Sequence, residues 1–187
     1  IAKPAEQTSL IALRAIELML SVGLPEHVVQ PVVARGSEVG KTIVPDERIQ
    51  AVMFTGSTET GTLISQTLAA RNDIQVPLIA ETGGQNCMIV DSTALPEQVV
   101  DDVISSGFQS AGQRCSALRV LFIQDDVADG IIEMLKGALA ELHIGDPSLL
   151  STDVGPVIDE KALKNLNDHV EYLKGNSILH YECKIPD

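Results

Sequence analysis

The feature that most constrains this chain is the alternation of short apolar runs with helical patterns. Compact apolar runs occupy residues 49–56 (IQAVMFTG) and 76–80 (VPLIA), and STETGTLISQTLAA between them has the composition of a helix start and a helix. An earlier run at 27–33 (HVVQPVV) is loosely strand-like. Strand, helix and strand joined by short connections favour parallel strands with right-handed crossovers. The sequence therefore predicts an α/β fold with a parallel sheet.

The remaining segments continue this pattern. Helical spacing over residues 5–21 brings apolar side chains near one face, and a short helix is expected from Ser37 to before Pro45. After a change of pattern near residues 83–86, we expect strands at NCMIV and RVLFI and helices from Pro96, over 126–142 and over 160–174. We accordingly divide the chain into domains 1–84 and 85–187.

Composition limits the classes of function. Hydrophobic residues make up 44% and aromatic residues 3% of the 187 residues, so the core must be aliphatic, which suits buried parallel strands. The formal net charge of −13 argues against nucleic acid or an anionic membrane as a partner. A phosphate-bearing cofactor stays possible because backbone amides bind anions on an acidic protein.

The three cysteines, Cys87, Cys115 and Cys183, form no CxxC pair. This argues against a disulfide framework or a zinc site and favours a reducing compartment, so we expect a cytoplasmic protein without a metal. No apolar run approaches the ~18 residues that span a membrane, and no signal peptide is visible. The chain has no initiator Met and enters a helical pattern at once, so we expect a piece of a larger protein.

Two glycine-containing stretches are candidates for binding phosphate. FTGSTETG (54–61) combines a strand end, a glycine turn and a helix start, which presents free N–H groups to an anion, although a plain capped helix explains it about as well. The GKT of ARGSEVGKT suggests a P-loop, but Gly36 leaves three residues before Gly40 where a Walker A loop needs four. We therefore reject the P-loop nucleotide-binding module as the weaker alternative.

Two side chains are candidates for catalysis. Glu81 follows an apolar strand and precedes Gly83 and Gly84, at the sheet edge where ligands bind, so it is a candidate general base rather than only a surface acid. Cys115 lies in the small, polar turn FQSAGQRCSAL and is a candidate nucleophile, although a lone cysteine is more often structural. Cys87, inside an apolar strand, is predicted to be structural.

Four stretches in this order and spacing resemble the aldehyde dehydrogenase superfamily: KPAEQT (3–8), FTGSTETG (54–61), ETGGQN (81–86) and GQRC (112–115). The variants AETGGQNCMIVD and SAGQRCSALRV are similar to the L-glutamate-γ-semialdehyde dehydrogenase branch, as in bifunctional proline-utilisation proteins. The resemblance covers less than half of a complete enzyme. It implies the later part of a Rossmann-like NAD-binding domain followed by the start of the catalytic domain.

The resemblance also implies roles for residues in the cofactor site. Lys3 and Glu6 would hydrogen-bond the ribose hydroxyls of the adenosine of NAD, and Gly56 and Ser57 would lie beside the pyrophosphate with Gly61 in the same turn.

In the catalytic site, the resemblance implies that Cys115 attacks the aldehyde, that Glu81 activates the water that hydrolyses the thioester, and that Ser116 contacts the substrate carboxylate. It further implies a small aldehyde substrate, a proline dehydrogenase domain on the same chain and a homo-oligomer in the complete protein. The alternative is a truncated piece that binds nucleotide weakly and turns over nothing, since the family's oxyanion-hole Asn and E-x-F-G-P segments are not in this sequence.

Overall fold

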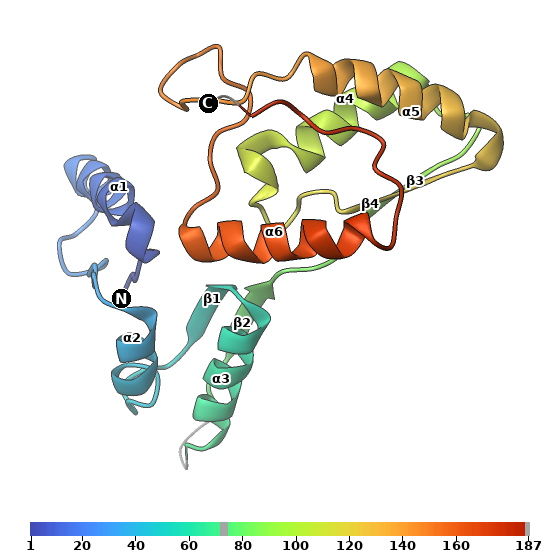
Figure 1. The fold of residues 1–187 in the computed structure, drawn as a ribbon. Coiled ribbons are helices and arrows are strands. Elements are labelled where there is room, and N and C mark those ends of the chain that lie inside the picture. The colour runs from blue at the N-terminus through green and yellow to red at the C-terminus, as the bar shows by residue number, and fades with distance from the viewer. Residues whose placement is uncertain (72–74, 186–187) are drawn as a thin grey trace. The chain divides into compact units, whose positions relative to one another are not determined.

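The computed structural model describes residues 1–71 and 75–185, and it divides the chain into two compact units, Ile1–Thr82 and Gly83–Asp187 (Figure 1). Each unit contains a pair of parallel strands flanked by helices. This confirms the predicted α/β fold with parallel strands. The sequence places the boundary between residues 84 and 85, and the roles assigned to the two domains stay predictions.

The first unit is built around a strand, a helix and a second strand. Strand β1 (Val52–Gly56) leads into helix α3 (Thr58–Ala69), and β2 (Leu78–Thr82) returns parallel to β1 with Thr55 opposite Glu81. Val44, Ile64 and Leu68 form the buried core of this unit. The elements before β1 are a short 3₁₀ helix η1 (Glu6–Thr8), helix α1 (Ser9–Ser21) and helix α2 (Gly36–Thr42).

Gly61 lets helix α3 lie close to the two strands. It is buried, and a Cβ atom at this position would be 3.2 Å from the Thr82 Cγ2 atom and 3.7 Å from the Phe54 ring. Contacts at 3.2 Å are tighter than ordinary van der Waals separation, so a methyl group at this position would require Thr82 or the helix to shift by a few tenths of an ångström. Gly61 therefore allows α3 to pack closely against β1 and β2.

The predicted strand at 27–33 is wrong. Its only pairing is a single bridge between Ala2 and Pro31, made by hydrogen bonds from Ala2 N to Gln30 O (2.8 Å) and from Val32 N to Ala2 O (2.9 Å). The next bond of this parallel ladder would run from the N–H of residue 4 to Val32 O, and Pro4 has no N–H group, so the bridge does not extend into a strand.

The second unit has the same parallel arrangement. Strand β3 (Cys87–Val90) pairs in parallel with β4 (Val120–Ile123), with Cys87 opposite Val120. Helices α4 (Pro96–Gly107) and α5 (Asp125–Ala140) pack against each other and on the strands, and Val90, Val99, Val103 and Ile131 form the core.

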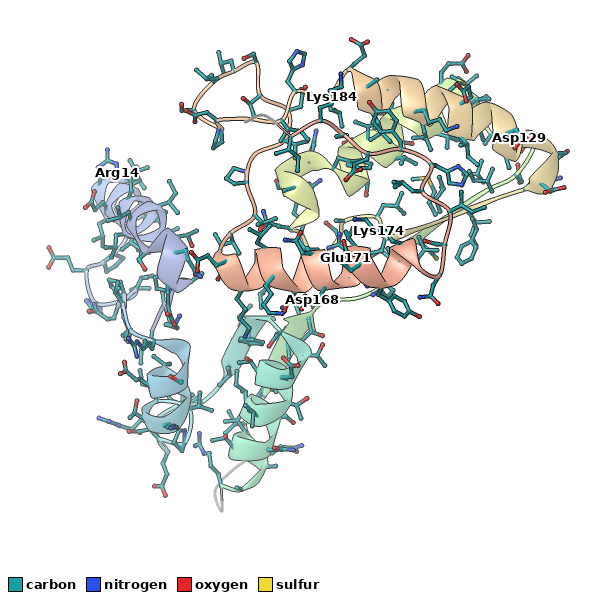
Figure 2. The ribbon with its side chains drawn as sticks, viewed as in Figure 1. Arg14, Asp129, Asp168, Glu171, Lys174 and Lys184 are labelled. Atoms are coloured by element: carbon teal, nitrogen blue, oxygen red, sulfur yellow. The ribbon has the colours of Figure 1, made fainter. Side chains whose placement is uncertain are left out.

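Helix α6 (Glu160–Lys174) is largely exposed. Ion pairs one turn apart, such as Lys174 with Glu171 at 2.8 Å, follow its charged side, where Asp168 also lies (Figure 2). Exposed pairs of this kind contribute little to stability. No helix in the described part of the chain is long and apolar enough to cross a membrane.

We expect Gly61→Val to destabilise the first unit. The added side chain would overlap Thr82 and the Phe54 ring, and overpacking of this kind costs about 1–3 kcal/mol in the free energy of unfolding. Urea unfolding should show a lower midpoint. Gly130→Val on α5 is the matched control, because a Cβ there meets nothing within 4 Å, and it should leave the midpoint unchanged or slightly higher. Equal midpoints for the two variants would contradict the packing role.

Candidate active site

The turn at the end of β1 forms a capped helix start. The Ser57 hydroxyl oxygen accepts a hydrogen bond from Thr60 N (3.2 Å), and Gly61 N donates to Ser57 O (3.0 Å) to begin the helical pattern. Gly56 is required next to the Phe54 ring, since a Cβ on Gly56 would be 2.5 Å from the ring. The turn thereby leaves the N-terminus of α3 open at the carboxyl end of the strands, where its dipole favours an anion.

Glu81 lies at the same edge of the sheet. It pairs with Thr55, one residue before the Gly56–Thr82 pair. Its neighbours Ala80 and Thr82 point toward Gly61 on α3, and alternation along the strand directs the exposed Glu81 side chain to the opposite face. The strand ends two residues later than predicted, so Glu81 lies within β2 rather than after it.

Lys3 and Glu6 lie near the start of the first unit. The Lys3 ammonium donates to Pro4 O (2.6 Å), and a Glu6 carboxylate oxygen accepts from Gly36 N (2.9 Å) at the beginning of α2. The Glu6 contact joins η1 to α2. The predicted contacts of both residues with a ribose stay predictions.

The turn that carries Cys115 is conformationally strained. Ser110 and Ala111 have φ angles of 55° and 53°, in the left-handed region that non-glycine residues rarely adopt, and Gly112 follows with φ 65°. Residues held in such conformations cost on the order of 1–3 kcal/mol each and concentrate at functional sites. The strain therefore supports a functional role for the turn.

Hydrogen bonds from the residues that directly precede β3 and β4 hold this turn. The Asn86 side-chain amide nitrogen donates to Cys115 O (2.7 Å) and to Ala117 O (3.0 Å). The Arg119 guanidinium donates to Gly112 O (2.7 Å) and to Arg114 O (3.4 Å). We refer to these contacts of Asn86 and Arg119 with residues 112–117 as the carbonyl clasp.

Gln113 and Arg114 attach the turn to neighbouring segments. Gln113 accepts a hydrogen bond from Ile158 N (2.7 Å) and donates to Pro156 O (3.3 Å), while Arg114 donates to Ser105 O (3.0 Å) on α4. Arg114 is therefore bonded to the main chain of α4, which gives it a structural role besides its position next to Cys115 in the sequence.

Sequence reasoning missed Asn86, Gln113 and Arg119 as supports of the turn. Asn86 and Gln113 lie within the stretches that resemble the family, but their hydrogen bonds join segments 31 and 45 residues apart. Arg119 is the first residue of an otherwise apolar run, RVLFI, and this polar residue at the strand start was the available signal.

The structure groups the predicted site residues as follows. Gly56, Ser57, Gly61 and Glu81 lie together at the carboxyl edge of the first unit. Cys115 and Ser116 are exposed neighbours in the second unit, so their meeting with Glu81 stays a prediction.

The other candidate features lie outside this arrangement. Lys41 belongs to helix α2 rather than to a phosphate-binding loop. Cys87 lies in β3, but its side chain is exposed, which contradicts a role in filling the core. Among the described residues, no group of three or more His, Cys, Asp or Glu side chains could hold a metal ion.

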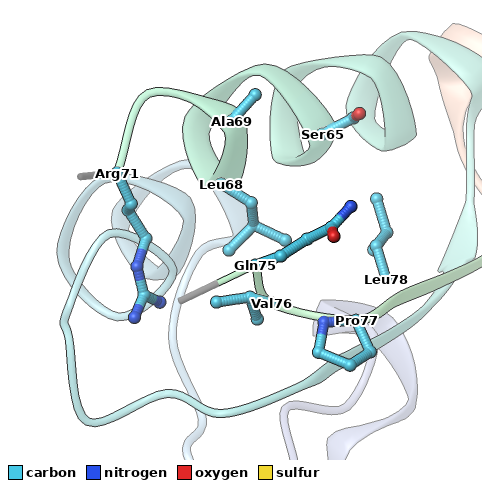
Figure 3. A pocket seen from close by; sticks show the side chains of 8 residues that line it. All are labelled: Ser65, Leu68, Ala69, Arg71, Gln75, Val76, Pro77 and Leu78. Atoms are coloured by element: carbon cyan, nitrogen blue, oxygen red, sulfur yellow. The ribbon is translucent and has the colours of Figure 1, made fainter. Parts of the chain in front are cut away.

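Two cavities also lie elsewhere. One, of about 600 Å³, lies at the amino end of β2 and the carboxyl end of α3, away from Glu81, and Leu68, Arg71 and Pro77 are among its lining residues (Figure 3). A second, apolar cavity of about 490 Å³ lies between α5, α6 and residues 177–182.

The parallel strand pairs flanked by helices define an α/β protein, and a strained turn in its second unit presents an exposed cysteine. The chain belongs to the aldehyde dehydrogenase family, which matches residues 1–180.

Among curated relatives, the bifunctional protein PutA of Salmonella typhimurium is 55% identical over 177 residues, which are 93% of this chain and 13% of that protein. The 1-pyrroline-5-carboxylate dehydrogenase of Geobacillus kaustophilus is 33% identical over 172 residues, or 90% of this chain and 33% of that protein.

Solved structures agree with these relatives. A bifunctional proline utilization A (PutA) protein superposes with a TM-score of 0.94 at 52% identity, over all of this chain and 19% of that one. The Δ-pyrroline-5-carboxylate dehydrogenase of Mycobacterium tuberculosis has a TM-score of 0.85 at 30% identity, over 92% of this chain and 33% of that one. The chain therefore spans a third or less of the length of these relatives.

We expect Cys183 to be alkylated more slowly than Cys87 at neutral pH. Burial raises the pKa of the Cys183 thiol, which lowers its thiolate fraction, whereas Cys87 is exposed. Iodoacetamide labelling followed by peptide mass spectrometry should show this order, and the difference should narrow as the pH rises and Cys183 ionises. Faster labelling of Cys183 would contradict the burial of its thiol.

Proposed function

We propose that this chain is part of an NAD-dependent aldehyde dehydrogenase that oxidises L-glutamate γ-semialdehyde to glutamate in proline catabolism. Membership of the aldehyde dehydrogenase family supports the reaction class. The similarity to PutA proteins and to proteins named 1-pyrroline-5-carboxylate dehydrogenase supports the choice of substrate. The single observation that carries the chemistry is the strained, hydrogen-bonded turn that presents an exposed Cys115.

The residues at the carboxyl edge of the first unit fit a dinucleotide. Gly56 keeps the turn narrow, Ser57 caps α3, and Gly61 lets the helix start approach the sheet. The N–H groups and the dipole at this helix start would hold the pyrophosphate of the cofactor. Lys3 and Glu6 supply an ammonium and a carboxylate for ribose hydroxyls. Bound NAD⁺ would supply the hydride acceptor for the oxidation.

Cys115 is the nucleophile in this proposal. Its thiolate sulfur bonds to the aldehyde carbon, and the carbonyl electron pair moves to the oxygen, which the Cys115 N–H stabilises. The resulting thiohemiacetal becomes a thioester on oxidation. Ser116, the next residue, contacts the carboxylate of the substrate.

Glu81 completes the cycle. Its carboxylate takes a proton from water as the water oxygen attacks the thioester carbon, and the C–S bond breaks to release glutamate and restore the thiol. The exposed position of Glu81 at the ligand-binding edge of β2 supports this role.

The surroundings of the enzyme are also part of the proposal. By analogy with the bifunctional relatives, a proline dehydrogenase domain precedes this segment on the same chain, and the complete protein is a cytoplasmic homo-oligomer. The 187 residues alone cover too little of the relatives to form the whole site, so the isolated chain should reduce NAD⁺ little or not at all.

Cys115→Ala in the complete enzyme should abolish both covalent adduct formation with the aldehyde and NADH production, because Cys115 is the nucleophile in this proposal. Loss of a nucleophile lowers kcat by several orders of magnitude. Cys87→Ala is the matched control, since Cys87 is also an exposed cysteine, and it should leave both measurements unchanged. Adduct formation by Cys115→Ala to the wild-type extent would disprove the assignment.

Glu81→Gln should separate the two halves of the reaction. The amide cannot accept the proton from water, so one equivalent of NADH should form in a burst while the thioester accumulates and steady-state turnover falls by about 10²–10⁴-fold. Rapid-mixing absorbance and intact-protein mass spectrometry would detect the burst and the adduct. A steady-state rate equal to that of the wild type would exclude Glu81 as the base.

A further inference from the structure

Asn86 occupies a position that links the Cys115 turn to the sheet of the second unit. Both hydrogen bonds of its side-chain nitrogen go to carbonyls of the turn, to Cys115 O and Ala117 O. Its main-chain carbonyl accepts from Arg119 N (3.0 Å) and Val120 N (3.1 Å) at the start of β4. A single residue thus fixes the turn relative to both strands.

The carbonyl clasp determines where the N–H groups of the turn point. Arg114 O is held by Ala117 N (3.1 Å) and Arg119, and Cys115 O is held by Asn86. A trans peptide directs its N–H opposite to its C=O, so the N–H groups of Cys115 and Ser116 point away from the clasp. Within the described part of the second unit, neither N–H donates a hydrogen bond.

We propose that Asn86 is a positioning residue, which acts through the main chain of residues 115–117 to aim the Cys115 and Ser116 N–H groups at the oxygen of the bound aldehyde. This inference rests on the proposed function of Cys115. Asn86 does not touch the substrate. Its contribution is preorganisation, because donors that are already aimed at the developing negative charge need no rearrangement during the reaction.

The chemistry suggests a way to isolate this role. When the Cys115 sulfur adds to an aldehyde, the carbonyl electron pair moves to oxygen and needs the N–H donors. When the same sulfur is alkylated by iodoacetamide, the new S–C bond forms as iodide leaves, and no oxyanion develops. A residue that positions the N–H donors therefore affects the first reaction and spares the second.

The test compares Asn86→Ala with the wild type in the complete enzyme. We expect kcat for aldehyde oxidation to fall by about 10²-fold with KM nearly unchanged, as for a misplacement of about 1 Å in an active site. The rate constant for alkylation of Cys115, followed by peptide mass spectrometry, should stay at the wild-type value. Asn165→Ala on the exposed face of α6 makes the same exchange away from the turn and should change neither measurement.

Two outcomes would overturn the positioning role: a wild-type kcat in Asn86→Ala, or an equal fall in kcat and in the alkylation rate, which indicates general disruption of the turn. If Asn86→Ala does not fold, Asn86→Leu removes the same donors while keeping the volume. Cys115→Ala distinguishes this failure from that of the proposed function. Full aldehyde turnover in Cys115→Ala refutes the nucleophile, whereas its loss together with wild-type kcat in Asn86→Ala refutes only the positioning role.

Discussion

The Cys115 turn depends on one set of hydrogen bonds, those of the carbonyl clasp in the second unit. Asn86 and Arg119 each lie one residue before a strand, and the parallel register places Cys87 opposite Val120. Asn86 and Arg119, at the amino ends of β3 and β4, therefore bind four main-chain carbonyls, those of Gly112, Arg114, Cys115 and Ala117. Gln113 adds two hydrogen bonds to Ser110 O, from its main-chain N (3.0 Å) and its side-chain Nε2 (3.1 Å). The clasp and Gln113 together therefore hold the turn in which Ser110 and Ala111 are left-handed.

In the first unit, the proposed binding of a dinucleotide phosphate raises a different physical problem, because the protein is acidic. The formal charge of −13 repels anions at long range, but within a few ångströms the amides at a helix N-terminus and the helix dipole decide the interaction. Close approach of α3 to the strands at Gly61 places these amides at the sheet edge. Gly61 therefore serves the packing of α3 against the strands and, in the proposed function, the binding of the phosphate as well.

Much of the fold followed from local patterns, and the failures have physical causes. The apolar repeat over 126–142 predicted α5, since Val127, Ile131 and Leu135 share one helical face, and all three are buried or half-buried. The prediction of a strand at 27–33 failed because strand composition does not ensure a partner, and Pro4 on the partner segment lacks the N–H group that would extend the ladder. Cys87 was predicted to be structural because its strand is apolar, but alternation along the strand directs its side chain to the exposed face.

In the candidate site, too, features defined by neighbouring residues were predicted and those formed by distant residues were missed. The glycine turn at Gly56 and the strand-end Glu81 were predicted because each is defined by neighbours in sequence. The supports of Cys115 were not, because Asn86 reaches Cys115 O across 29 residues and only the fold brings them together. A side-chain amide that bonds to main-chain carbonyls leaves no pattern in the sequence that marks its partners.

The most direct test of the central claim is residue-resolved amide hydrogen exchange, measured by NMR on the protein labelled with ¹⁵N-cysteine and ¹⁵N-alanine. The clasp predicts that the Cys115 amide exchanges rapidly, because it points away from every described acceptor, while the Ala117 amide, bonded to Arg114 O, is protected. A Cys115 amide as protected as that of Ala117 would show that its N–H is already bonded within the protein, and the proposed orientation of the turn would be wrong.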